Sequence, residues 1–326
     1  MDENAIVEVL KSGLNLASTS ISAIVGAVIT TLFLRKNTKT SEFEKIKAGK
    51  YKEVIDQLLG SGKMSYLEYH KCNNFLDIAK IADKSMADIH GFYGEKTSGN
   101  SDFNFDWFIR FFEAASNISN ENMQKFWAAI LAGEVYRGGS YSLRAIDTLY
   151  NMTALEAELF SNVSKMVIDG KMILSSFQIF ENNSNERKIG ERINSTYSFD
   201  NDSLRLLEEC GIINGLLMRN KLELEPNEDY GFTCGDKLLL FKPSGNKKVI
   251  IEYVSYFLTM VGIQLYPITS PGTDNHYLID LGKEMKKSYP ELTVSLHPIN
   301  LESVYIDDLN SDEDGISYNN EIDLLE

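Results

Sequence analysis

The stretch that decides the fold runs from Ser119 to Phe160 and reads SNENMQKFWAAILAGEVYRGGSYSLRAIDTLYNMTALEAELF. Its first apolar residues recur every three or four positions and form one face of a helix. They are Met123, Phe126, Trp127, Ile130 and Leu131. Ser119 is the expected N-cap of this helix, and Gly133 is its expected end. The pattern predicts a helix packed on its neighbours through one apolar side.

Two further helices follow in the same stretch. The letters RGGS at 137–140 indicate a turn, after which Leu143, Ile146 and Leu149 have helical spacing. The letters TALE at 153–156 form a capping box, in which Thr153 and Glu156 satisfy each other's backbone N–H groups. We therefore expect residues 101–168 to form a helical core.

The same residues carry a resemblance to a known family. The segments WFIRFFEAASNISNENMQKFWAAILAGEV (residues 107–135) and GSYSLRAIDTLYNMTALEAELF (residues 139–160) resemble a widespread bacterial family known as domain of unknown function number 2806. The resemblance implies a helical core followed by a smaller mixed domain. It implies no activity and supplies no catalytic residues.

Charged residues inside this motif are the candidates for a polar site. Arg110 and Glu113 are three positions apart and predict a surface pair. Glu134 and Arg144 are expected to be partly buried and to fix the turn between two helices. A ligand site formed by Arg110, Glu134 and Arg144 is the alternative.

After a short N-terminal flank at 1–13, residues 14–34 contain no charge. A helix of these 21 residues spans about 31 Å, which matches a bilayer core. Basic residues are concentrated after it, which predicts a single-pass inner-membrane protein with its N-terminus outside and its body in the cytoplasm. The acidic N-terminus argues against a signal peptide. The alternatives are a helix in the core of a soluble cytoplasmic oligomer and a helix lying on the membrane surface.

Small residues line one side of this segment, which predicts helix association in either environment and hence a homo-oligomer. The predicted association face consists of Ser18, Ser22, Ala23, Gly26, Ala27 and Thr30. Residues 35–100 then predict a charged helical stem, ending near Gly60, and a long amphipathic helix.

Residues 169–300 contain several apolar runs typical of strands and predict a smaller α+β domain. MILSSFQIF at 172–180 indicates a strand, NDSLRLLEECGIING at 201–215 indicates a helix, and KLLLFKPSGNKKVIIEYV at 237–254 predicts a hairpin. This order resembles a winged helix-turn-helix. Its wing would present Lys242, Lys247 and Lys248 to a phosphate backbone. The formal net charge of -15 makes nucleic acid an unlikely partner.

The C-terminal residues 301–326 are acidic and predict a solvated, disordered tail that binds a partner. Within it, Asn310, Asp312, Asp314 and Glu321 have the spacing of an EF-hand-like calcium loop, although the first ligand is normally Asp. Calcium is the one cofactor that any pattern here favours.

The sequence contains no recognisable catalytic motif. Its three cysteines are widely spaced, without a CxxC pair. The sequence predicts a mainly α protein with a smaller α+β part that serves as a membrane-anchored cytoplasmic interaction or sensor protein without catalytic activity. A role in bacterial stress or phage defence would suit this design. The alternative is a soluble oligomeric regulator that contacts nucleic acid through the winged-helix-like domain.

Overall fold

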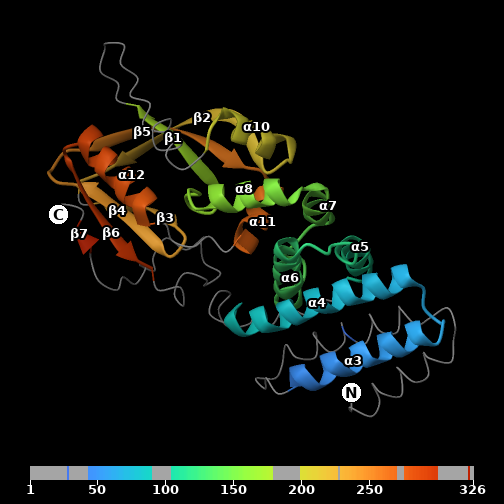
Figure 1. Ribbon diagram of the computed structural model, residues 1–326. Coiled ribbons are helices and arrows are strands. Elements are labelled where there is room, and N and C mark those ends of the chain that lie inside the picture. The colour runs from blue at the N-terminus through green and yellow to red at the C-terminus, as the bar shows by residue number, and fades with distance from the viewer. Residues whose placement is uncertain are drawn as a thin grey trace. The chain divides into compact units, whose positions relative to one another are not determined.

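The computed structural model describes Val28 and residues 43–89, 104–178, 199–226, 228–269, 275–299 and 322–323. Helices and two small sheets make up this part of the chain (Figure 1). The chain divides into two compact units between Tyr150 and Asn151. This division falls inside the predicted helical core 101–168.

The first unit is helical. Its elements are α3 (Phe43–Gly60), α4 (Tyr66–Ile89), α5 (Phe105–Ala115), α6 (Glu121–Tyr136) and α7 (Leu143–Asn151). The stem helix α3 ends at Gly60 as predicted, and α4 runs beside both α3 and α6 (Figure 1). Phe75 of α4, Phe111 of α5 and Trp127 of α6 are almost completely buried. Their burial places the core of this unit between these three helices.

Side-chain caps fix where the helices begin. Asn120, and not the predicted Ser119, is the N-cap of α6, because its Oδ1 accepts a hydrogen bond from the Met123 N–H at 3.0 Å. The capping box between Thr153 and Glu156 is confirmed at the start of α8 (Ala154–Ser164). The helix predicted over 201–215 is confirmed only for its first part, as α10 (Asn201–Glu209), because the chain becomes a strand at Ile213.

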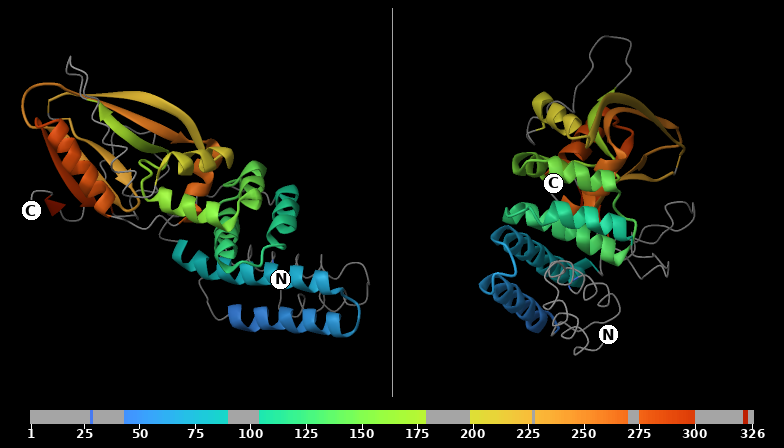
Figure 2. Two further views of the ribbon diagram at one scale, coloured as in Figure 1. Left: turned by 45° about the horizontal axis from the view of Figure 1, so that its top comes forward. Right: turned by 90° about the vertical axis from the view of Figure 1, so that its right-hand side faces the viewer.

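The second unit contains two antiparallel sheets. The first has the order β1-β5-β2, formed by β1 (Met172–Gln178), β5 (Val249–Leu258) and β2 (Ile213–Leu224). The second has the order β3-β4-β6-β7, formed by β3 (Tyr230–Cys234), β4 (Lys237–Pro243), β6 (Leu292–Pro298) and β7 (Ile322–Asp323). The helices α8, α10, α11 (Met260–Leu265) and α12 (Asn275–Ser288) and the short 3₁₀ helix η1 (Tyr266–Thr269) complete the unit (Figure 2).

The predicted hairpin over 237–254 is wrong. Its two strands, β4 and β5, belong to different sheets, and residues 244–248 carry the chain from one sheet to the other. The hairpin that does form joins β3 to β4, with Cys234 opposite Lys237 and Gly235 at a positive φ of 57°. The wing of a winged helix is therefore absent from this position.

The predicted disordered tail contributes one short element. Ile322 and Asp323 form β7, which pairs antiparallel with Leu296 and Ser295 of β6. The four proposed calcium ligands of the tail lie outside the described residues.

In the part of the chain that the structure describes, no helix is long and apolar enough to cross a membrane. The predicted span 14–34 lies outside this part apart from Val28, which is helical and buried. All six residues of the predicted association face likewise lie outside it.

Candidate interaction surface

Glu134, near the end of α6, organises the motif turn. Its carboxylate accepts hydrogen bonds from the backbone N–H groups of Gly139, at 2.6 Å, and Tyr141, at 3.2 Å. The side chain is buried, and burial raises the pKa of Glu134 against the lowering effect of these hydrogen bonds. The prediction that Glu134 fixes the turn is confirmed by these two hydrogen bonds.

Aromatic packing holds the same turn from the other side. Trp107 of α5 donates its indole N–H to the carbonyl oxygen of Tyr141 at 2.8 Å, inside the core. The Tyr141 ring lies against Gly133, where a Cβ would approach the ring within 2.8 Å. Close packing against Tyr141 therefore requires a glycine at position 133. Gly133 lies within the last turns of α6, which continues to Tyr136, and so does not end the helix as the sequence predicted.

The other two members of the predicted polar site are separate from Glu134. Arg110 pairs with Asp147 of α7 at 2.8 Å, and not with Glu113 as predicted. Arg144 is exposed, contrary to the expectation of partial burial. Within the described residues, no contact joins either arginine to Glu134. The structure therefore assembles no three-residue polar site in the motif.

Glu134 gives a pH-dependent prediction. A carboxyl group whose pKa is higher in the folded state binds its proton more tightly there, so stability falls as pH rises from the ordinary value of 4.5 through the folded pKa. We expect the free energy of unfolding of the wild type, relative to Glu134→Gln, to decrease as the pH rises above the ordinary pKa of 4.5. Urea unfolding of both proteins checks this, and a difference that stays constant or grows would contradict it.

The Arg110–Asp147 pair gives a prediction of small effect. Both side chains are about half exposed, at 53% and 44%. Arg110→Ala, Asp147→Ala and the double variant should each lower the free energy of unfolding by less than about 1 kcal/mol, because water screens the pair. A double-mutant cycle measured by urea unfolding gives the coupling energy. A coupling energy above about 2 kcal/mol would contradict the prediction, because a pair of that strength is shielded from water.

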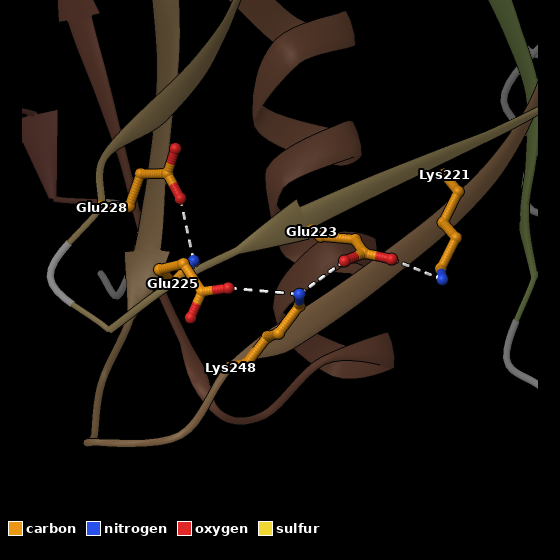
Figure 3. A network of polar contacts seen from close by, with 5 residues as sticks. All are labelled: Lys221, Glu223, Glu225, Glu228 and Lys248. Carbon is orange, nitrogen blue, oxygen red and sulfur yellow. Dashed lines mark hydrogen bonds and ion pairs between the residues drawn. The ribbon is translucent and has the colours of Figure 1, made fainter.

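The three proposed wing lysines do not form one surface. Lys242 lies on β4 in one sheet, whereas Lys248 precedes β5 in the other. Lys248 contacts Glu223 at 2.5 Å and Glu225 at 3.1 Å (Figure 3). These carboxylates balance its charge and raise the pKa of Lys248. Lys242 and Lys247 are exposed. A phosphate backbone would have to displace the glutamates from Lys248.

Figure 3 shows that this network continues along β2. Glu223 also contacts Lys221 at 2.5 Å, and these two lysines lower the pKa of Glu223 to about 2. The backbone N–H of Glu225 donates to Glu228 at 2.8 Å, which fixes the turn after the strand. The exposed end of β2 therefore carries ordered charges of both signs.

A bulge interrupts β2 before these charges. Asn214 pairs with Phe257 and Met218 with Ser255, so three residues of β2 stand opposite one residue of β5. Leu216, Leu217 and Met218 at this bulge are exposed to 71%, 53% and 50%. A run of three exposed apolar residues is unfavourable in water, which makes these residues the candidate for a contact surface.

The bulge is held in place by hydrogen bonds. The Gly215 N–H donates to Glu208 of α10 at 3.2 Å, and the Leu216 N–H donates to the Asn214 side chain at 3.1 Å. A Cβ at position 215 would collide with the Glu208 carboxylate. The exposed leucines therefore belong to an organised feature. We call the exposed side chains of residues 216–219, 221 and 223 the β2 surface.

Three ionisable side chains outside the β2 surface are buried or hydrogen-bonded within the fold. Burial raises the pKa of Cys72 and of Cys210 to about 11, so both thiols are protonated and unreactive near neutral pH. Asp169, which has a φ of 52°, accepts two hydrogen bonds from Thr233 at 2.9 Å. The described residues contain no group of three potential metal ligands.

Comparison with known proteins identifies one family. The model of a family described as "Protein of unknown function (DUF2806)" matches residues 63–282, which is about two thirds of the chain and includes both the motif turn and β2. No curated protein and no solved structure gives a significant match.

Proposed function

The chain belongs to the DUF2806 family, and from that premise we propose that it is a membrane-anchored cytoplasmic interaction or sensor protein that binds its partner through the β2 surface. The observation that carries this proposal is the run of three exposed apolar residues on the β2 bulge. Burial of such side chains in a complex contributes about 25 cal/mol for each Å² of apolar area removed from water.

The composition of the β2 surface suits a protein partner. Its apolar centre is followed on the same strand by Arg219, Lys221 and Glu223, which are exposed. Apolar residues bordered by charged ones are common in protein interfaces. The rim charges would give the contact its orientation and its salt dependence.

A substitution tests the contact in cells. Leu217→Arg should remove the full-length chain from any discrete complex seen on a native gel, because a buried arginine without a partner is costly. Leu155→Arg is the matched control, since Leu155 on α8 is 79% exposed and lies away from β2 in the sequence. Equal migration of the wild type and both variants would contradict the proposal.

The membrane part of the proposal rests on residues 14–34 and on the basic residues that follow them. We expect the full chain to stay in the membrane pellet after carbonate extraction and a chain lacking residues 1–36 to be released. A full-length chain that is wholly soluble would overturn the anchor and leave the β2 surface to be tested alone.

A further inference from the structure

The outer edge of β2 is the longest unpaired sheet edge among the described strands. β2 has twelve residues and pairs with β5 on one side only, because the sheet order is β1-β5-β2. Within the described ranges no strand pairs with its other side. An edge of this kind presents backbone N–H and C=O groups that can pair with another strand.

The charges along this edge have a particular order. Arg219, Lys221, Glu223 and Glu225 are all exposed and alternate with other residues, so two positive charges are followed by two negative ones. When β2, which ends at Leu224, pairs antiparallel with a copy of itself about Leu222, Lys221 lies opposite Glu223. A two-fold axis produces this pair twice.

Neighbouring registers lack this match. A two-fold axis at Lys221 places this lysine opposite its own copy, and an axis at Glu223 places two glutamates together. If the two-fold axis lay between two residues, each exposed charged residue would stand opposite a residue whose side chain points to the other side of the sheet. The charge order therefore selects the register centred on Leu222.

From this pattern we infer that two copies of the chain associate by antiparallel pairing of their β2 strands about Leu222. The inference rests on the proposed function and names a second copy as the partner. Opposite charges directly across a strand pair stabilise the pairing. Within one chain Glu223 contacts both Lys221 and Lys248, and both contacts are exposed. Exchanging the contact with Lys221 for the same contact between chains therefore costs little.

The turn after β2 defines both ends of the paired segment. β2 ends at Leu224, which lies opposite Asn220 in this register, and the Glu225 N–H donates to Glu228 in the turn that follows. The apolar bulge precedes this segment on the same strand.

A cysteine at the two-fold axis tests the pairing in the full chain. Residues directly opposite each other on antiparallel strands have Cα atoms about 4.5–5.5 Å apart, which suits a disulfide. Leu222→Cys should therefore give a disulfide-linked dimer under mild oxidation. Leu155→Cys, at an exposed position on α8, and the parent chain with its three native cysteines are the controls.

Charge reversal makes the test specific. Adding Lys221→Glu or Glu223→Lys to Leu222→Cys should lower the yield of linked dimer about tenfold, because like charges then face each other. Mixing the two reversed proteins should restore the yield as a heterodimer, and the doubly reversed chain should restore it alone. An association through the N-terminal segment would show neither pattern.

The failure of this inference is distinguishable from the failure of the proposed function. No more linked dimer from Leu222→Cys than from Leu155→Cys, or a yield unchanged by charge reversal, would overturn the pairing of two copies. If the pairing failed but Leu217→Arg still removed the chain from the complex seen in cells, the β2 surface would bind a different protein. If that variant also had no effect, both would be wrong.

Discussion

Replacement of Trp127 by alanine is expected to lower the free energy of unfolding of the first unit by about 3–5 kcal/mol. Trp127 is completely buried, and its ring centroid lies 5.5 Å from that of Phe111. Its indole N–H has no hydrogen-bond partner, so the loss reflects packing and the cavity alone. Urea unfolding followed by circular dichroism measures the change.

Leu67→Ala is the control for this prediction. Leu67 lies on α4 of the same unit and is 66% exposed, so its truncation should change stability by less than about 0.5 kcal/mol. Similar losses for Leu67→Ala and Trp127→Ala would show that the core of the unit has been placed wrongly.

Replacement of Gly262 by alanine should destabilise the second unit by about 1–3 kcal/mol or more. A Cβ at Gly262 would collide with the carbonyl oxygen of Ile212, a backbone atom. That carbonyl accepts a hydrogen bond from the Thr259 N–H at 2.9 Å, and Thr259 also bonds the Gly211 carbonyl. The backbone therefore has little room to move away from an added methyl group.

Gly245→Ala provides the matched control. No atom lies within 4 Å of the position where its Cβ would be, and this glycine lies in the exposed connection between β4 and β5. We expect no loss of stability there. Thermal unfolding of both variants compares them directly, and equal melting temperatures would contradict the packing of α11 against residues 211–212.

Local signals in the sequence predicted the helices well because helices depend on neighbours in the chain. The capping box at Thr153 and Glu156 was correct for this reason. The N-cap of α6 differed by one residue, since Ser119 and Asn120 are both capable of capping and only the hydrogen bond to Met123 distinguishes them.

Strand pairing was predicted less well because the partners of a strand are distant in the chain. The apolar runs at 237–243 and 249–258 resemble a hairpin, although each has better partners elsewhere. The Gly235–Asp236 turn was the signal that would have placed the hairpin correctly. The strands β2, β3 and β6 were not predicted at all.

The β2 surface could not be predicted from periodicity. The letters GLLM at 215–218 read as an apolar run that belongs in a core. Their exposure results from the bulge, which depends on a hydrogen bond from Gly215 to Glu208 on α10. Likewise, the Arg110–Asp147 pair joins residues 37 positions apart, beyond the reach of a helical spacing rule.

Photo-crosslinking in living cells tests most directly whether this chain is an interaction protein that uses the β2 surface. A photoreactive amino acid replaces Leu217 in the full-length chain, and the same residue replaces Leu155 in the control. We expect discrete adducts from position 217 that are absent at position 155. Position 217 giving no adduct, or the two positions giving the same adducts, would contradict it.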